Sequence, residues 1–222
     1  MTTVNKKVLF IITSRAQYED GTPTGLWLEE ASEPYHILTE SGIDVDIVSI
    51  EGGEIPLDPN STQNDELTKY AQFVEKISDV PSIDNINVSD YDAVYLPGGH
   101  GTVFDFAHNQ KLATILADFK DEGKFISSVC HGPSAFVGAK DKNGKYLVEG
   151  VTLTSFTDDE ERTMGLENKV PFLTQTELEQ QGAKFVTKDN FTEHVETDSQ
   201  FITGQNPQSS VAIGEALKDA LI

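Results

Sequence analysis

Short, nearly continuous runs of apolar residues recur along the chain and alternate with stretches in which apolar residues stand three or four positions apart. Continuous runs are typical of strands buried on both faces of a parallel sheet, and spacings of three and four indicate amphipathic helices. Strands that alternate with helices predict an α/β fold, with a mostly parallel central sheet and helices on both faces. The predicted strands are residues 7–13, 43–50, 91–96, 125–129, 151–156, 184–187 and 201–204.

Glycine and proline set the predicted limits of the helices. A helix that begins near Thr24 is expected to break or restart at Pro34, because proline suits the first helical turn and not the interior. It should end at Gly42, and the helix around residues 112–119 should end near Gly123, because glycine readily adopts the conformation of a helix C-terminal cap. Further helices are predicted at residues 67–77, 173–181 and 213–221.

Residues 1–222 fit one large domain, since the chain has no internal repeat and no linker rich in Pro or Ser. Within its second half, residues 141–144 predict a turn and residues 146–148 an extended piece. Three stretches have the composition of insertions on the α/β core, near residues 15–25, 51–90 and 140–180. We therefore expect a single domain that carries these insertions.

The chain is strongly acidic. Lys and Arg number 16 and Asp and Glu 37, which gives a formal net charge of −21 at pH 7. Phosphate groups would repel such a protein, so the charge disfavours a nucleic-acid partner. It also disfavours docking on an anionic membrane surface, and its simplest role is solubility. The apolar fraction of 37% is enough for a buried core and too high for a disordered chain.

Cys130 is the only cysteine, so the chain can form neither an intramolecular disulfide nor a zinc site with a cysteine pair. The amino-terminal apolar run covers only about seven residues before Ser14 and Arg15, and no small-residue cleavage site follows, so no secretory signal is expected. No apolar run reaches the roughly 20 residues that span a bilayer. We therefore expect a cytoplasmic protein in a reducing compartment, where a lone thiol stays reactive.

Cys130 directly follows the predicted strand at residues 125–129, and residues 131–133, His-Gly-Pro, come next. An apolar run that ends on a polar residue and turns into a helix predicts a strand–helix corner, the geometry that exposes the nucleophile of other α/β enzymes. A helix amino terminus also lowers the pKa of a thiol, and the thiolate is the reactive form. Cys130 is therefore a candidate nucleophile. The alternative is a small buried apolar residue, as free cysteines often are.

His131 could orient or deprotonate the thiol, and it would then need a carboxylate on its other ring nitrogen to fix the tautomer. The acidic residues after the predicted strand at 151–156 should lie at the same edge of the sheet. Any of four could serve: Asp158, Asp159, Glu160 and Glu161. The alternative interpretation is a solvated, acidic first turn of a helix, which the helix dipole favours.

A glycine-rich turn, Gly98-Gly99-His100-Gly101, follows the predicted strand at residues 91–96. Glycine lets backbone N–H groups approach a ligand, so this turn is a candidate oxyanion hole. The alternative is a tight strand–helix turn with no such role. The turn lacks the G-x-G-x-x-G spacing after a first strand that marks dinucleotide binding.

Glu30 stands among apolar residues, with Trp27 roughly one helical turn earlier on the same face. Burial raises the pKa of a carboxyl, and a protonated acid beside a sulfur can donate a hydrogen bond or transfer a proton. The alternative is an ordinary solvated helix glutamate.

No metal or cofactor site is predicted. Metal-binding histidines usually recur at short, fixed spacings such as H-x-x-x-H. None of the five histidines shows such spacing: His36, His100, His108, His131 and His194.

Four motifs together make the chain similar to a known family. They are residues 24–30 (TGLWLEE), 96–102 (LPGGHGT), 129–133 (VCHGP) and 155–158 (SFTD). With these motifs in this order, the chain resembles the ThiJ/PfpI superfamily, which is class I glutamine amidotransferase-like. Within it, the chain is most similar to the heat-shock protein 31-like branch of the glyoxalase III type.

The resemblance implies a flavodoxin-like three-layer sandwich in which Cys130 is the nucleophile-elbow cysteine. It implies that His131 is the histidine of a catalytic triad, that Glu161 is its acid, and that Glu30 contacts the cysteine. It also implies an oxyanion hole formed by Gly99 and the backbone N–H of His131.

The implied activity is conversion of methylglyoxal, a small reactive dicarbonyl, into lactate by a homodimer, without glutathione, metal or other cofactor. The Cys130 thiolate would attack the aldehyde to give a hemithioacetal. Glu30, alone or with His131, would then move a proton between the two carbons through an enediol. Because the superfamily has divergent roles, three alternatives stay open: a stress-induced holdase chaperone, a protein or nucleotide deglycase, and an oxidative-stress sensor in which Cys130 becomes a sulfinate.

Overall fold

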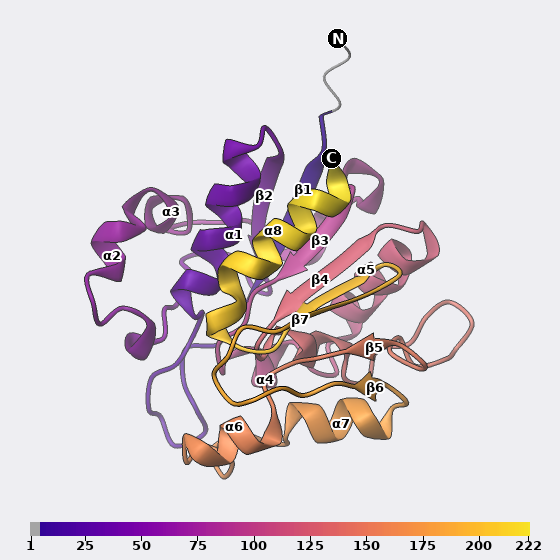
Figure 1. The fold of residues 1–222 in the computed structure, drawn as a ribbon. Helices are drawn as coiled ribbons and strands as arrows, with labels where there is room; N and C mark the ends of the chain where they lie inside the picture. Colours follow the sequence, from indigo (N-terminus) through magenta and orange to yellow (C-terminus); the bar gives the residue numbers. More distant parts are fainter. Residues whose placement is uncertain (1–4) are drawn as a thin grey trace.

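A six-stranded sheet separates two layers of helices in the computed structural model, which describes residues 5–222 (Figure 1). Its strands are β1 (Lys7–Ile12), β2 (Asp44–Ser49), β3 (Ala93–Leu96), β4 (Phe125–Val129), β7 (Val195–Asp198) and β8 (Phe201–Gly204). The order is β2-β1-β3-β4-β8-β7, and only β7 is antiparallel to its neighbour. The order reverses at β1, which is the flavodoxin-like arrangement. The predicted α/β fold with a mostly parallel sheet is confirmed.

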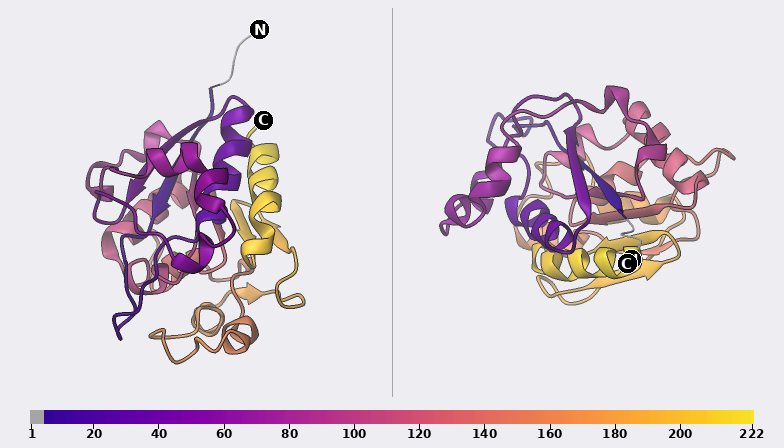
Figure 2. Two further views of the ribbon diagram at one scale, coloured as in Figure 1. Left: turned by 90° about the vertical axis from the view of Figure 1, so that its left-hand side faces the viewer. Right: turned by 90° about the horizontal axis from the view of Figure 1, so that it is seen from above.

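Three long helices cover the two faces of the sheet: α1 (Leu28–Glu40), α5 (Gln110–Asp121) and α8 (Ser210–Leu221). Figure 2 shows α1 and α8 side by side on one face. In β1, Val8 and Phe10 pack in the apolar cluster with α1 and α8, whereas Leu9 and Ile11 pack in the cluster with α5. Successive side chains of a strand point to opposite faces, so a continuous apolar run requires cover on both.

Helix α1 runs through Pro34 without interruption, so the predicted break at this residue is wrong. Proline has no N–H, which leaves the carbonyl oxygen of Glu30, four residues earlier, without its helical partner. The hydroxyl of Tyr95, on β3, donates a hydrogen bond to this oxygen. The sheet thus compensates for the proline, and the backbone of Glu30 is tied to β3.

Short helices fill the connections. The helix predicted at residues 67–77 is divided at Tyr70, and the one predicted at 173–181 is confirmed. Gly42 and Gly123 follow α1 and α5 with φ of 80° and 69°, as predicted for C-terminal caps. The α-helices are α2 (Glu66–Lys69), α3 (Ala71–Lys76), α4 (Thr102–Asp105), α6 (Asp158–Thr163) and α7 (Thr174–Gln180). The 3-10 helices are η1 (Pro59–Ser61), η2 (Ile83–Asn85), η3 (Val88–Asp90), η4 (Gly132–Phe136) and η5 (Pro207–Ser209).

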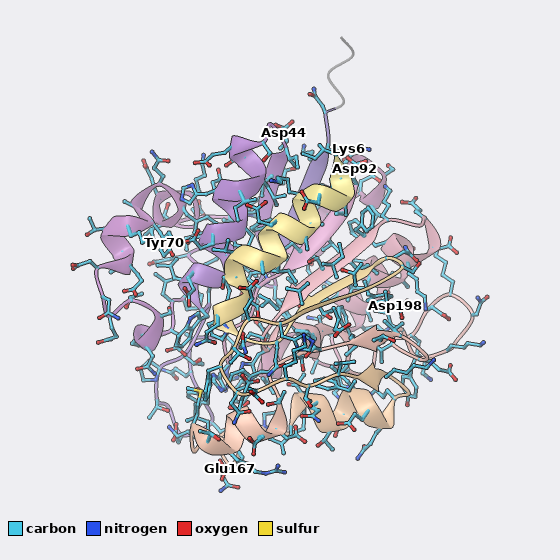
Figure 3. All side chains as sticks on the ribbon, in the orientation of Figure 1. Lys6, Asp44, Tyr70, Asp92, Glu167 and Asp198 are labelled. Atoms are coloured by element: carbon cyan, nitrogen blue, oxygen red, sulfur yellow. The ribbon has the colours of Figure 1, made fainter. Side chains whose placement is uncertain are left out.

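The segment after η4 departs from the prediction. Residues 151–156 contribute only β5 (Thr152–Leu153), which pairs with β6 (Lys184–Phe185) in a separate two-stranded sheet. The predicted extended piece at 146–148 is reduced to a single bridge from Tyr146. Asp198, labelled in Figure 3, holds the small sheet against β7, because its carboxylate accepts a hydrogen bond from the N–H of Thr152 at 2.7 Å. Strands β5 and β6 are so short that their apolar and polar residues do not distinguish them from strands of the central sheet.

The two ends of the sheet differ in what covers them. Figure 3 shows Lys6, Asp44 and Asp92 together at the amino ends of the first strands and Glu167 at the opposite end. That opposite end, where the parallel strands finish, is covered by α6 and α7 (Figure 1). Among residues 5–222, no helix has the length and apolar character needed to cross a membrane.

Candidate active site

Cys130 lies at the corner where β4 ends and η4 begins, as predicted. Its φ of 59° is in the left-handed region, which residues with a side chain rarely adopt. The N–H of Cys130 donates to the carbonyl of Gly204 at 3.0 Å, and its own carbonyl accepts from the N–H of Phe156 at 2.8 Å. These bonds hold a strained conformation of the kind that concentrates at functional sites.

The pKa of the Cys130 thiol is raised well above its ordinary value, so the predicted lowering by a helix amino terminus is wrong. Burial is the main cause, because the residue is only 3% exposed, and the neighbouring acidic side chains of Glu30, Glu160 and Glu161 add to it. The helix that follows is a single short 3-10 segment. The resting site therefore holds a protonated thiol, which needs a nearby base to become a thiolate.

His131 lies between that thiol and a buried carboxylate. Its Nδ1 is 3.5 Å from Sγ of Cys130, and its Nε2 is 2.5 Å from Oε2 of Glu161. Burial, followed by the neighbouring His100, lowers the pKa of His131, so the ring is neutral near pH 7. Because an ionised Glu161 can only accept, the ring proton is on Nε2, and the lone pair of Nδ1 faces the thiol. This tautomer can take the thiol proton.

Glu161 accepts hydrogen bonds from two histidines, since its Oε1 is also 2.6 Å from Nε2 of His100. Burial alone would raise the pKa of Glu161. Interaction with His131 and the hydrogen bonds from both rings outweigh burial and lower this pKa well below its ordinary value. Glu161 is therefore ionised in the folded protein.

His100 joins the site, although its motif predicted a role only for the neighbouring glycine backbone. Its side chain is buried, packs on His131 with 4.0 Å between ring centroids, and lines the same cavity as Cys130. A signal for this residue exists in the sequence: it follows a strand end, as Cys130 does. The sequence does not reveal that β3 and β4 are neighbours, which brings the two strand ends together.

Helix α6 carries the four acidic residues predicted as partners of His131, and they differ in burial. Asp159 is exposed, in agreement with a solvated helix start, and Asp158 is partly exposed. Glu160 and Glu161 are buried, so that interpretation is wrong for these two. The predicted reason for their position is also wrong, because β5 is outside the central sheet. The segment reaches the site through the hydrogen bond between Phe156 and Cys130.

Glu160 is turned away from the histidines and fastens neighbouring loops together. It forms a capping box with Thr157 at the start of α6. One of its oxygens also accepts from the side chain of Gln205 at 3.1 Å. The other accepts from the N–H of Phe191 at 2.9 Å and from the side chain of Asn206 at 3.1 Å. The same helix thus supplies a partner for His131 and an anchor for two loops beside the cavity.

Glu30, in the first turn of α1, is completely buried and lines the cavity with Cys130. Its Oε1 accepts a hydrogen bond from the N–H of Gly98 at 2.8 Å, and its Oε2 has no partner in the part of the chain that the structure describes. Burial raises the pKa of Glu30 well above its ordinary value, and the interactions with Gly98 and the Cys130 thiol do not reverse this. The expectation of a poorly solvated carboxyl is confirmed, and the alternative of a solvated glutamate is wrong.

The glycine turn after β3 allows backbone groups to approach one another closely. A Cβ on Gly98 would stand 2.7 Å from Oε1 of Glu30 and 2.8 Å from the backbone nitrogen of His131. Gly99 has a φ of 107°, and a Cβ there would stand 1.9 Å from the carbonyl oxygen of Gly25. Within residues 5–222, the N–H groups of Gly99 and His131 have no protein acceptor. Both are therefore available to a ligand oxygen.

These groups surround one cavity of about 170 Å³. Its polar lining includes the carboxyl of Glu30, the thiol of Cys130 and the rings of His100 and His131. The rest is largely apolar: Trp27, Phe156, Met164, Phe191 and Pro207. The fold thus brings Glu30, Gly99 and His131 together with Cys130, and Glu161 lies behind them on His131.

Three side chains of the site could in principle hold a metal ion. His100, His131 and Glu161 offer ligand atoms that all lie within 4.8 Å of one another. Sequence spacing could not reveal this set, because its members come from three separate segments. Each imidazole Nε2 already pairs with a Glu161 oxygen, so a metal would have to replace both hydrogen bonds.

The chain is similar to known proteins along nearly its whole length. The sequence profile of the DJ-1/PfpI family matches residues 6–219. Glutathione-independent glyoxalase HSP31 of Saccharomyces cerevisiae is 32% identical, with 97% of this chain and 98% of the yeast protein covered. Among solved structures, the Rapid Encystment Protein of Francisella tularensis is 35% identical, with a TM-score of 0.92 and coverage of 98% and 99%. Glyoxalase III of Candida albicans is 29% identical, with a TM-score of 0.88 and 97% of each chain covered.

Proposed function

The chain belongs to the DJ-1/PfpI family, and we propose that it is a glutathione-independent glyoxalase of the glyoxalase III type, which converts methylglyoxal and water into lactate. Relatives named for this activity align with almost all of it. The substrate is a small reactive dicarbonyl, and the reaction as we propose it uses only side chains and backbone of this chain.

The main support for the proposal is a second carboxyl group, that of Glu30, beside the Cys130 thiol. This thiol already has a histidine and an acid as partners. Hydrolysis by a cysteine nucleophile needs only a set such as Cys130, His131 and Glu161. Conversion of a ketoaldehyde to a hydroxy acid also moves a hydrogen from one carbon to the next. That step needs a group beside the sulfur that both gives and takes a proton. Glu30, with its raised pKa and a partner-free oxygen, fits this requirement.

The reaction begins with addition of the thiol to the aldehyde. Nδ1 of His131 takes the thiol proton, and the thiolate of Cys130 bonds to the aldehyde carbon. The oxygen of that carbon becomes negative and is stabilised by the free N–H groups of Gly99 and His131. Protonated Glu30 gives its proton to this oxygen, and a hemithioacetal results with Glu30 ionised.

Proton transfer between the two carbons follows. Ionised Glu30 removes the hydrogen of the former aldehyde carbon, and the protonated His131 gives its proton to the ketone oxygen, which yields an enediol. Glu30 then protonates the second carbon, while His131 takes the proton of the first hydroxyl. The product is a lactoyl thioester on Cys130, with Glu30 ionised and His131 protonated.

Water completes the cycle. A water molecule attacks the thioester and loses a proton to Glu30, and the departing sulfur of Cys130 takes a proton from His131. Lactic acid leaves, and the thiol, the neutral imidazole and the protonated carboxyl are restored. The pKa directions of the resting site are those that this cycle begins from.

The test is lactate formation from methylglyoxal in the absence of glutathione. We expect Cys130→Ala to fall to background and Glu30→Gln to lose about 10²–10⁴-fold in kcat, the range typical of general acid–base groups. Glu40→Gln is the matched control, since this glutamate is at the exposed end of the same helix. If Cys130→Ala or Glu30→Gln kept the turnover of Glu40→Gln, the proposal would be wrong.

The alternatives make different demands on the same site. A peroxide sensor works best with a low-pKa, accessible thiol, whereas Cys130 is buried with a raised pKa.

A holdase chaperone needs a contiguous apolar surface. Among residues 5–222, the exposed large apolar side chains come from separate segments: Leu67, Tyr146, Met164, Val211 and Ile222. A deglycase would consume a preformed methylglyoxal–arginine adduct faster than free methylglyoxal, and we expect the opposite order.

We also propose that residues 1–222 form one domain and that the protein acts in the cytoplasm as a homodimer. A free, buried cysteine favours a reducing compartment. One cooperative unfolding transition, a sedimentation mass of twice the chain, and recovery in the cytosolic fraction are the expected results. A monomeric mass or two separate transitions would contradict them.

A further inference from the structure

The cavity is larger than methylglyoxal needs, and much of its wall is apolar. Methylglyoxal has five non-hydrogen atoms and a single methyl group, whereas a cavity of about 170 Å³ has room for several water molecules. Five apolar side chains from different segments line it: Trp27, Phe156, Met164, Phe191 and Pro207. Part of this wall is open to solvent, since Met164 is 41% exposed. A larger apolar substituent on the substrate would remove this surface from water.

One member of this wall is held in place at a conformational cost. Phe191 has a φ of 56°, which is unfavourable for a bulky residue. The buried carboxylate of Glu160 accepts a hydrogen bond from its N–H at 2.9 Å. The ring then lies 6.2 Å from that of Phe156, which itself is 4.5 Å from the ring of His131. An aromatic surface thus continues from the reacting groups to the edge of the cavity.

The charges around the cavity select against anionic substrates. Within residues 5–222, its lining includes the carboxyl groups of Glu29 and Glu30, the second of which is neutral at rest, and no lysine or arginine. Glu161 adds a negative charge behind the histidines. A phosphate or carboxylate on the substrate would therefore be both desolvated and repelled.

We infer that the site is built for neutral 2-oxoaldehydes whose substituent is apolar and larger than methyl, such as an aromatic ring. This inference rests on the proposed function and narrows its substrate class. The aldehyde would react at Cys130 as methylglyoxal does, and the substituent would lie against Met164 and Phe191. The product is the corresponding 2-hydroxy acid, so the atoms balance as in lactate formation.

The experiment compares kcat/KM for methylglyoxal, phenylglyoxal and 4-carboxyphenylglyoxal. For the wild type we expect phenylglyoxal to exceed methylglyoxal at least tenfold, and to exceed its carboxylated derivative at least tenfold. Intrinsic reactivity also differs between substrates, so variants supply the decisive ratios. In Met164→Ala and in Phe191→Ala, we expect phenylglyoxal to lose about tenfold and methylglyoxal less than about threefold.

Met164→Ala keeps the test valid if Phe191→Ala folds poorly, because Met164 is partly exposed at the end of α6. Leu67→Ala, an exposed apolar residue of α2 outside the cavity, is the control and should leave all ratios unchanged. If the enzyme converts methylglyoxal and converts phenylglyoxal at an equal or lower rate, the inference is wrong and the proposed function is unaffected. Phenylglyoxal-to-methylglyoxal ratios that stay unchanged in both wall variants also overturn it. Absence of both lactate and mandelate overturns the proposed function itself.

Discussion

Glu30 and Glu161 are both buried carboxyl groups of one site, yet their surroundings move their pKa in opposite directions. Burial is the largest influence on each and acts upward in both cases. Glu30 has the backbone N–H of Gly98 and the thiol of Cys130 to oppose it. Glu161 has two imidazole N–H groups, from His100 and His131. The kind of partner, and not the degree of burial, therefore decides the sign.

The difference assigns the two groups to different chemistry. A carboxyl that is neutral at rest can donate a proton, whereas one that is ionised can only accept hydrogen bonds and fix its neighbours. Glu30 is thus suited to proton transfer with substrate, and Glu161 to holding His131 in the tautomer that faces the thiol. Two predictions test this contrast, and two more test the contacts that hold the segments of Glu30 and Glu161 in place.

The largest expected effects separate the two carboxyls by reaction step. Glu161→Gln should reduce turnover of methylglyoxal by about 10²–10⁴-fold, because His131 loses the partner that fixes its tautomer. It should slow addition of the thiol, so little covalent adduct forms. Glu30→Gln should lose a similar factor but accumulate the adduct, since protonated His131 can protonate the adduct oxygen in place of Glu30, whereas the base that removes the carbon-bound hydrogen is missing. Intact-mass measurement under non-denaturing conditions, with methylglyoxal present, detects the adduct on Cys130, and equal adduct levels in both variants would contradict the contrast.

The second prediction concerns stability and has opposite signs for the two groups. The folded-state pKa of Glu30 is raised, so its stabilisation is complete below the unfolded value of about 4.3 and is lost as pH rises toward the folded pKa. The folded-state pKa of Glu161 is lowered, so its contribution is present above about 4.3 and is lost as pH falls. Each contributes up to about 1.4 kcal/mol per pH unit inside its window.

The measurement is the free energy of unfolding in urea of the wild type and of both Gln variants, Glu30→Gln and Glu161→Gln, between pH 3 and pH 8. Glu30→Gln should become more stable than wild type as pH rises above about 4.3, and the destabilisation by Glu161→Gln should shrink as pH falls below it. Parallel curves for the two variants would refute the assignment of opposite shifts.

Glu160, the neighbour of Glu161, offers a smaller effect that tests helix α6 itself. Gln at this position would turn an amide NH₂ toward donors such as the N–H of Phe191. We expect Glu160→Gln to lower the free energy of unfolding by about 1–3 kcal/mol, the cost of buried hydrogen-bonding groups that lose their partners. Chemical denaturation measures it, with exposed Asp159→Asn as the control. A loss no larger than that of the control would show that Glu160 does not anchor these loops.

The smallest prediction concerns the backbone of Glu30. Tyr95→Phe removes the hydroxyl that satisfies the Glu30 carbonyl and should cost about 1 kcal/mol. Pro34→Ala restores the helical N–H to the same carbonyl, so the Tyr95→Phe loss should be smaller in the Pro34→Ala background. Unfolding of the four proteins in a double-mutant cycle gives the coupling directly. Strict additivity would mean that Tyr95 and Pro34 do not share this carbonyl.

Local pattern predicted the parts of the fold that depend on adjacent residues. The strand at residues 125–129 and the corner at Cys130 follow from an apolar run that ends in His-Gly-Pro. Pattern failed where distant groups intervene. Pro34 does not end α1 because a tyrosine of β3 replaces the missing donor. The antiparallel β7 was not predicted, since its residues carry no apolar alternation.

The candidate site likewise has features that the local sequence predicted and features that only distant contacts decided. The chain alone determined which residue types stand at strand ends and tight turns, because periodicity and glycine requirements act within a few residues. Only the tertiary structure decided that Glu161 reaches His131, that His100 joins them, and that the pKa of the Cys130 thiol rises. Strand order, burial and hydrogen-bond partners set these outcomes, and each depends on segments that meet only when the chain folds.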